Sequence, residues 1–77
     1  MEILIGEKET QEYVDEAKKA LEKENEIILK GVGRDTVKAV DVAELLKKEG
    51  IKTKDIKIDT EEKDEKRISH ILISLEK

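Results

Sequence analysis

The stretch KGVGRDTVKAVDVA, residues 30–43, contains the transition from strand to helix around which the rest of the chain is organised. The aliphatic run Ile27–Leu29 directly before it is typical of a strand in the interior of a sheet. Gly31-Val32-Gly33 then forms a turn, and a helix begins at residues 34–35. We expect this helix to end at Gly50, because glycine readily adopts the left-handed conformation that closes many helices.

The same stretch places basic side chains around the start of the helix. A helix N-terminus offers unpaired backbone N–H groups and a partial positive charge, which together favour an anion. The turn formed by Gly31 and Gly33, framed by Lys30, Arg34 and Lys38, is therefore a candidate phosphate-binding site. The alternative interpretation is an ordinary solvated helix start in which Arg34 pairs with a nearby glutamate.

The hydrophobic pattern predicts the remaining elements on either side of this stretch. Strands are expected over residues 1–5, 26–32, 54–60 and 67–75, and a first helix over about residues 10–24 with Thr10 as its N-cap. The all-charged segment 61–66 is predicted to be a flexible solvated loop. The order βαβαββ predicts one α+β domain over residues 1–77, a two-layer sandwich of a four-stranded mixed sheet with both helices on one face.

The second helix has more apolar residues than one buried face requires. They are Val37, Ala39, Val40, Val42, Ala43, Leu45 and Leu46. We therefore expect part of this helix to face a second subunit.

Composition limits the classes of protein to consider. Charged residues make up 47% of the chain, Phe, Trp and Pro are absent, and the hydropathy pattern contains no membrane span or signal-like start. The lack of Cys excludes disulfides and thiolate metal sites, and a cytoplasmic protein is expected. Such a charge bias is common in hyperthermophile proteins and also in designed ones, so both origins stay open.

The net charge of −4 argues against a nucleic-acid-binding protein, but the charge is unevenly distributed. Residues 1–26 contain nine acidic and four basic side chains, whereas residues 27–58 contain five acidic and eight basic ones. Residues 59–77 contain six acidic and four basic side chains. Because salt screens charge over about 8 Å, the local excess of base around the glycine turn matters more than the total.

Three separated motifs resemble the Alba family of archaeal chromatin proteins. They are the strand, glycine turn and helix with Lys38-Ala39-Val40-Asp41, the start Ile3-Leu4-Ile5-Gly6-Glu7-Lys8 with Tyr13-Val14, and the end Arg67-Ile68-Ser69-His70-Ile71-Leu72-Ile73. The resemblance implies a non-catalytic, chromosome-associated protein that binds DNA and/or RNA as a dimer, through backbone phosphates and with little sequence specificity. The order of preference between DNA and RNA stays open.

The resemblance also implies further contacts with nucleic acid. The family's lysine pair in the first turn aligns with Glu7-Lys8, so Lys8 is a candidate contact, while acetylation control at the first position is not expected. The family's hairpin arm aligns with residues 61–66, where Lys63, Lys66 and the adjacent Arg67 are candidates. The four carboxylates of this segment oppose such a role. Val32 replaces a basic residue of the family.

Other kinds of site have little support in the sequence. His70 is the only histidine and has no Cys partner, so no catalytic residue, metal site, cofactor or small-molecule substrate is expected. The main alternative function is a subunit that binds nucleic acid weakly or not at all and forms a heterodimer with a basic Alba paralogue, modulating chromatin assembly. Homodimer and heterodimer both stay open, and no membrane partner is expected.

Overall fold

The computed structural model describes residues 1–77 as four strands and two helices in the order βαβαββ. The elements are β1 (Glu2–Leu4), α1 (Thr10–Lys23), β2 (Glu26–Val32), α2 (Asp35–Lys48), β3 (Lys52–Lys63) and β4 (Lys66–Glu76). The bounds of β2 match the prediction, and the other elements differ at their ends. Neither helix is long and apolar enough to span a membrane.

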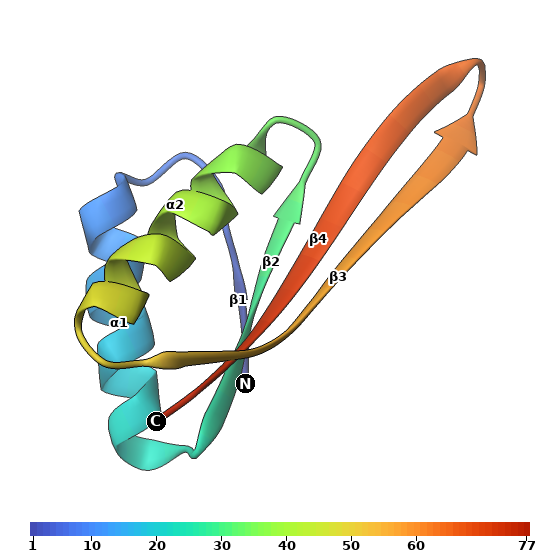
Figure 1. Cartoon of the computed structure of the whole chain (residues 1–77). Helices are drawn as coiled ribbons and strands as arrows, with labels where there is room; N and C mark the ends of the chain where they lie inside the picture. Colours follow the sequence, from blue (N-terminus) through green and yellow to red (C-terminus); the bar gives the residue numbers. More distant parts are fainter.

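The four strands form one mixed sheet with the strand order β1-β2-β4-β3. β1 runs parallel to β2, and β4 runs antiparallel to both β2 and β3. Both helices lie on the same side of the sheet, as Figure 1 shows. The predicted α+β two-layer fold is therefore confirmed, with the aliphatic strand β2 in an interior position.

The core lies between the helices and one face of the sheet. α1 contributes one stripe at helical spacing, which is the stripe predicted from the sequence, and β2 contributes every second residue. The buried residues of α1 are Tyr13, Val14, Ala17, Ala20 and Leu21, and those of α2 are Ala39, Val42, Ala43 and Leu46. Every residue of the buried core is apolar or Tyr13, so the folded state keeps its charges at the surface.

The prediction of Thr10 as the cap of α1 is wrong. Thr10 is the first helical residue, and Glu9 occupies the cap position without a side-chain hydrogen bond. The backbone carbonyl of Glu9 accepts hydrogen bonds from the N–H groups of Glu12, at 3.0 Å, and Tyr13, at 3.4 Å. These backbone hydrogen bonds close the first turn of α1 without a side-chain cap.

The prediction of a flexible loop over residues 61–66 is also wrong, because β3 and β4 continue through it. Lys63 pairs with Lys66, and only Asp64 and Glu65 form the turn, with positive φ angles of 51° and 66°. Two central residues with positive φ are typical of a tight hairpin turn whose twist matches that of the strands. The hairpin extends well beyond the helices as a two-stranded arm (Figure 1).

Gly31 sets how closely α2 approaches the sheet. A Cβ atom at this position would lie 2.7 Å from the backbone oxygen of Asp35 and 3.0 Å from the Cβ of Ala39. Both are closer than ordinary van der Waals contact, and a backbone atom cannot move aside without displacing the helix.

We therefore expect Gly31→Ala to destabilise the protein by about 1–3 kcal/mol, the usual cost of overpacking a core. In a domain of this size each 1 kcal/mol lowers the melting temperature by roughly 4–8 °C, which differential scanning calorimetry measures. Gly6→Ala is the control, because its Cβ would meet only the Tyr13 hydroxyl oxygen at 3.4 Å, an ordinary contact. Equal melting temperatures for the two variants would contradict this role of Gly31.

Candidate functional site

The turn between β2 and α2 is fixed against the base of the arm. Gly33 has a φ of 59°, a conformation that favours glycine, and its N–H donates to the backbone oxygen of Ser69 in β4 at 2.7 Å. The carbonyl of Gly33 accepts from the N–H of Thr36 at 3.2 Å. Gly31 is buried under α2. The prediction that Gly31 belongs to the turn is wrong, because Gly31 lies in β2 opposite Ile71. Gly33 shapes the turn, and its N–H is already occupied.

Arg34 is the basic residue that this turn leaves exposed. It occupies the cap position of α2, its backbone is helical, and its side chain makes no ion pair and no hydrogen bond. Its backbone N–H donates to no backbone carbonyl either. The alternative in which Arg34 pairs with a glutamate therefore does not describe this structure. An anion in solution has access to both the guanidinium and the helix start.

Lys30 lies on a different face from the start of α2. β2 directs Ile27, Leu29 and Gly31 towards the helices, where all three are buried. Side chains alternate along a strand, so Lys30 points to the sheet face that carries no helix. The structure therefore does not gather Lys30 and Lys38 around the same point beside Arg34.

Lys38 connects α2 to the loop between β1 and α1. Its ammonium donates hydrogen bonds to the backbone oxygens of Gly6 and Lys8, both at 2.9 Å. The loop of residues 6–8 and the start of α2 are thereby held side by side, although about thirty residues separate them in the sequence. Two of the three N–H donors of Lys38 are occupied in this way.

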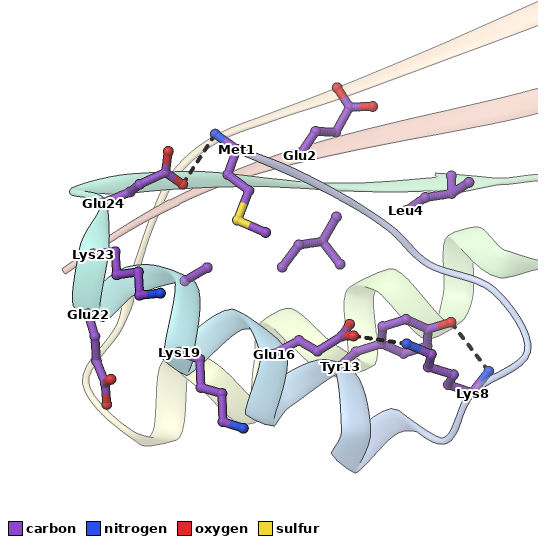
Figure 2. A pocket seen from close by; sticks show the side chains of 12 residues that line it. Met1, Glu2, Leu4, Lys8, Tyr13, Glu16, Lys19, Glu22, Lys23 and Glu24 are labelled. Atoms are coloured by element: carbon purple, nitrogen blue, oxygen red, sulfur yellow. Dashed lines mark hydrogen bonds and ion pairs between the residues drawn. The ribbon is translucent and has the colours of Figure 1, made fainter.

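Lys8 is exposed but not free. Figure 2 shows its ammonium directed at Glu16 of α1, with an Nζ–Oε1 distance of 2.9 Å, and its backbone N–H at the Tyr13 hydroxyl. The hydrogen bond to Glu16, together with the charge of that carboxylate, raises the pKa of Lys8 above its ordinary value of 10.5. Lys8 therefore stays cationic at neutral pH, and a phosphate has to share it with Glu16.

The tip of the arm carries the remaining predicted basic residues. Lys63 and Lys66 are directly opposite each other across the hairpin, and neither forms an ion pair. Arg67 donates from Nε to Glu62 Oε1 at 3.2 Å, which neutralises much of its charge. Like charges directly opposite each other in a sheet are unfavourable, so the lysine pair would gain from a nearby anion.

Groups for metal binding or acid–base chemistry are not brought together. No three His, Asp or Glu side chains are arranged to hold a metal ion. His70 is partly buried on β4, with Nε2 3.6 Å from Glu61 Oε2 and without a hydrogen-bond partner. Its strand position opposite Val32 and Asp59 agrees with a structural or surface role.

A groove of about 880 Å³ runs between β1 and α1, on the side of the sheet away from the arm. Met1 and Leu4 supply exposed apolar surface there, and charged side chains form the rim (Figure 2). Two pairs of these charges form ion pairs, the N-terminal ammonium with Glu24 at 3.6 Å and Lys8 with Glu16 at 2.9 Å. This is the arrangement of a solvated surface, and no acid–base pair stands out in it.

The structure thus brings together one part of the predicted site and separates another. Lys38 joins the loop carrying Lys8 to the first turn of α2, which follows Arg34. Lys30 lies on the other face of the sheet, and Lys63 and Lys66 lie at the arm tip. Sequence reasoning missed Tyr13 and Glu16 as partners of this loop, because both fit the pattern of α1 without further explanation. The only available signal was the position of a hydroxyl-bearing aromatic in the apolar stripe, close to a glycine turn.

Comparison with known proteins places these features in a family. The sequence matches the Alba family over residues 1–60. A segment of 56 residues, 69% of this chain, is 43% identical to the DNA/RNA-binding protein Alba 2 of Saccharolobus shibatae and 41% identical to that of Saccharolobus solfataricus. The segment covers 63% of each relative, so the match extends over less than two thirds of their length.

Solved structures agree with this assignment. Alba from Thermoplasma volcanium superposes with a TM-score of 0.84 at 32% identity, over 100% of both chains. ALBA1 from Trypanosoma brucei has a TM-score of 0.88 over 99% of this chain and 68% of its own, and at 24% identity this likeness shows the fold alone. The match over residues 1–60 shows that this chain belongs to the Alba family.

Proposed function

We propose that this protein binds DNA and/or RNA through backbone phosphates, without catalysis, and that it associates with the chromosome. The observation that carries the proposal is Arg34, a cation without a partner at the exposed start of a helix. The loop that presents Lys8 lies on the same part of the surface. Guanidinium groups bind phosphate with charge-assisted hydrogen bonds, and the counterions released add to the affinity.

Two further findings support this function. The Saccharolobus relatives are named as DNA/RNA-binding proteins, and none of the names describes an enzyme. The segment 61–66, which was predicted to be a flexible loop, forms the tip of the β3–β4 arm and carries Lys63 and Lys66 without ion-pair partners. We propose Lys63 and Lys66 as secondary contacts, with Arg67 weakened by its pairing to Glu62.

Chemical-shift mapping with ¹⁵N-labelled protein tests where nucleic acid binds. On titration with a short duplex DNA or a structured RNA, the largest shifts are expected at residues 6–8 and 33–35. Shifts confined to residues 10–23 of α1 would contradict the proposed site. Parallel titrations with the two ligands also decide between DNA and RNA.

We further propose that the protein is a dimer formed through an apolar strip of Val37, Val40, Ile56 and Ile58. These four residues are 41–71% exposed. Ile56 and Ile58 are opposite the buried Ile73 and Ile71, but no helix covers this edge of the sheet. Exposed aliphatic residues gathered on neighbouring elements are typical of a protein interface.

The position of the strip leaves the proposed binding surface free. Val40 follows Lys38 by two residues, which places it about 200° away around α2. Since Lys38 faces the loop of residues 6–8, the strip lies on the flank of α2 away from that loop. A two-fold dimer through the strip would therefore present two copies of Arg34 to one nucleic acid.

Glu16 should limit the affinity, because it competes with phosphate for Lys8. We expect Glu16→Gln to strengthen binding by roughly two- to fivefold, the range for loss of one exposed ion pair. Fluorescence anisotropy with a labelled duplex at constant salt measures this change.

Glu22→Gln is the matched control for that substitution. Glu22 is also exposed on α1, and it makes no ion pair, so its substitution removes the same charge without releasing a lysine. A general effect of net charge would strengthen binding equally in both variants. Equal gains, or no gain with Glu16→Gln, would show that Lys8 does not contact phosphate.

A second candidate function is a partner subunit for a basic Alba paralogue. The observation in its favour is the acidic segment 1–26, with nine acidic and four basic side chains, together with the pairing of Lys8 by Glu16. In this case the apolar strip would bind the paralogue, and the paralogue would supply most of the positive charge. Native mass spectrometry of a mixture distinguishes the two: mixed dimers support the partner role, and exclusive homodimers oppose it.

A further inference from the structure

Two side chains from different helices satisfy the backbone of the loop at residues 6–8. Lys38 of α2 donates to the oxygens of Gly6 and Lys8, each at 2.9 Å. The Tyr13 hydroxyl of α1 accepts from the N–H groups of the same two residues, at 2.7 Å for Gly6 and 3.3 Å for Lys8. Both N–H groups and both carbonyls of Gly6 and Lys8 therefore have a partner.

The only other side-chain hydrogen bond of residues 6–8 joins Lys8 to Glu16. Residues 6–9 belong to neither a helix nor a strand, and Glu7 and Glu9 are exposed. Tyr13 is buried in the core and cannot move with the loop. Lys38 is partly buried between α2 and the loop, and it supplies the only charge-assisted bonds to the loop backbone. Bonds to a charged donor are stronger than neutral ones.

We propose that Lys38 is a positioning residue, which holds the loop of residues 6–8, and with it Lys8, against the first turn of α2. This inference rests on the proposed binding of nucleic acid. It differs from the interpretation of Lys38 as a phosphate contact, because the ammonium is committed to two backbone carbonyls. The Lys38 side chain also joins the two parts of the proposed binding surface, which are the start of α2 and the loop of residues 6–8 after β1.

The expected effect on binding follows from preorganisation. A ligand that needs the ordered loop binds with an affinity reduced by the fraction of time that the loop is ordered. If removal of the ammonium leaves the loop ordered about one fifth of the time, affinity falls about fivefold. The number of phosphates contacted in the complex does not change, so the dependence of affinity on salt keeps its slope.

The test compares Lys38→Met, which keeps much of the apolar stem, with Lys38→Arg, which keeps the charge and the donors. Salt titrations of binding and amide hydrogen exchange are measured on each full-length variant. Lys38→Met should bind about fivefold more weakly with an unchanged salt slope. The amides of Gly6 and Lys8 should exchange roughly tenfold faster or more. Lys38→Arg should restore both properties.

Lys47→Met is the matched control, because Lys47 is exposed in the last turn of α2 and contacts neither part of the surface. It should leave the exchange of Gly6 and Lys8 unchanged. A fall in salt slope of about 0.9 for each subunit, with unchanged loop exchange, would overturn the proposal and make Lys38 a direct phosphate contact. Faster loop exchange with unchanged affinity would overturn it as well.

The same measurements separate this proposal from the proposed function. If the wild-type protein binds no nucleic acid, the proposed function is wrong. The claim that Lys38 positions Lys8 for binding is then wrong as well. The exchange rates would still decide whether Lys38 orders the loop, because they are measured without ligand. Unchanged exchange in Lys38→Met would overturn that ordering role whatever the affinity.

Discussion

Arg34→Ala is expected to weaken binding to duplex DNA by on the order of tenfold for each subunit at moderate salt, because each lost phosphate contact removes one released counterion. In a dimer the salt slope should become less steep by about 1.8, or 0.9 per subunit. The fold should be unaffected, since the Arg34 side chain is exposed and has no partner. Anisotropy titrations at several salt concentrations measure both quantities.

Lys23→Ala is a suitable control for Arg34→Ala. Lys23 is an exposed base in the last turn of α1, and it also makes no ion pair. The Lys23→Ala substitution removes the same charge as Arg34→Ala, but at the C-terminal end of α1 and away from the glycine turn. If the two variants lose affinity equally, Arg34 acts only through net charge and the proposed site is wrong.

Ile58→Asp should produce the other large effect, by disrupting the proposed dimer. Ile58 is 71% exposed, so an aspartate is tolerated in the isolated chain, whereas a buried unpaired charge in an interface is costly. Sedimentation velocity should show a monomer. Binding to a duplex long enough for both subunits should weaken by about 10² or more, because the second copy of the surface no longer adds avidity.

Leu4→Asp is the matched control for the interface variant. Leu4 is a 63% exposed aliphatic residue on β1, at the opposite edge of the sheet from Ile58. Leu4→Asp should remain a dimer. Because Leu4 lines the same groove as Lys8, the oligomeric state, and not the affinity, is the control. A dimeric Ile58→Asp protein, or a wild-type monomer, would contradict the proposed interface and shift attention to other exposed apolar residues.

The elements with a strong hydrophobic period could be predicted from the sequence. The stripe of α1 and the alternation of β2 each depend on burial against the same core, so local pattern and tertiary structure agree. The sequence also indicated that α2 has more apolar residues than one buried face requires, and Val37 and Val40 are indeed exposed in the structure. Helix caps were less predictable, because Thr10 is the first helical residue and Glu9 occupies the cap position.

Hydrophobic pattern did not predict strands over residues 61–66, because this segment is charged on both faces. Only the resemblance to the Alba family aligned an arm with it. No core selects apolar residues beyond the helices, so β3 keeps its strand register with β4 without a hydrophobic signal. The turn at Asp64 and Glu65 also lacks glycine, although both residues have positive φ. A sequence rule based on Asn-Gly or Asp-Gly turns therefore misses it.

The sequence predicted which types of residue form the candidate site, but it did not predict how they are arranged in space. The basic residues around the glycine turn were evident from the sequence, and Arg34 is exposed as that pattern requires. The roles of Lys30 and Lys38 depend on which face of an element each occupies and on contacts across about thirty residues. Those contacts arise only when α2 packs beside the turn after β1.

A salt titration of the wild-type protein with duplex DNA and structured RNA, followed by fluorescence anisotropy, tests phosphate binding most directly. We predict micromolar or tighter affinity that falls steeply with salt, with a slope of about −0.9 for each phosphate neutralised on a duplex. Absence of binding to both ligands at low salt would contradict the proposed function. So would affinity that does not depend on salt, because contacts to phosphate necessarily release counterions.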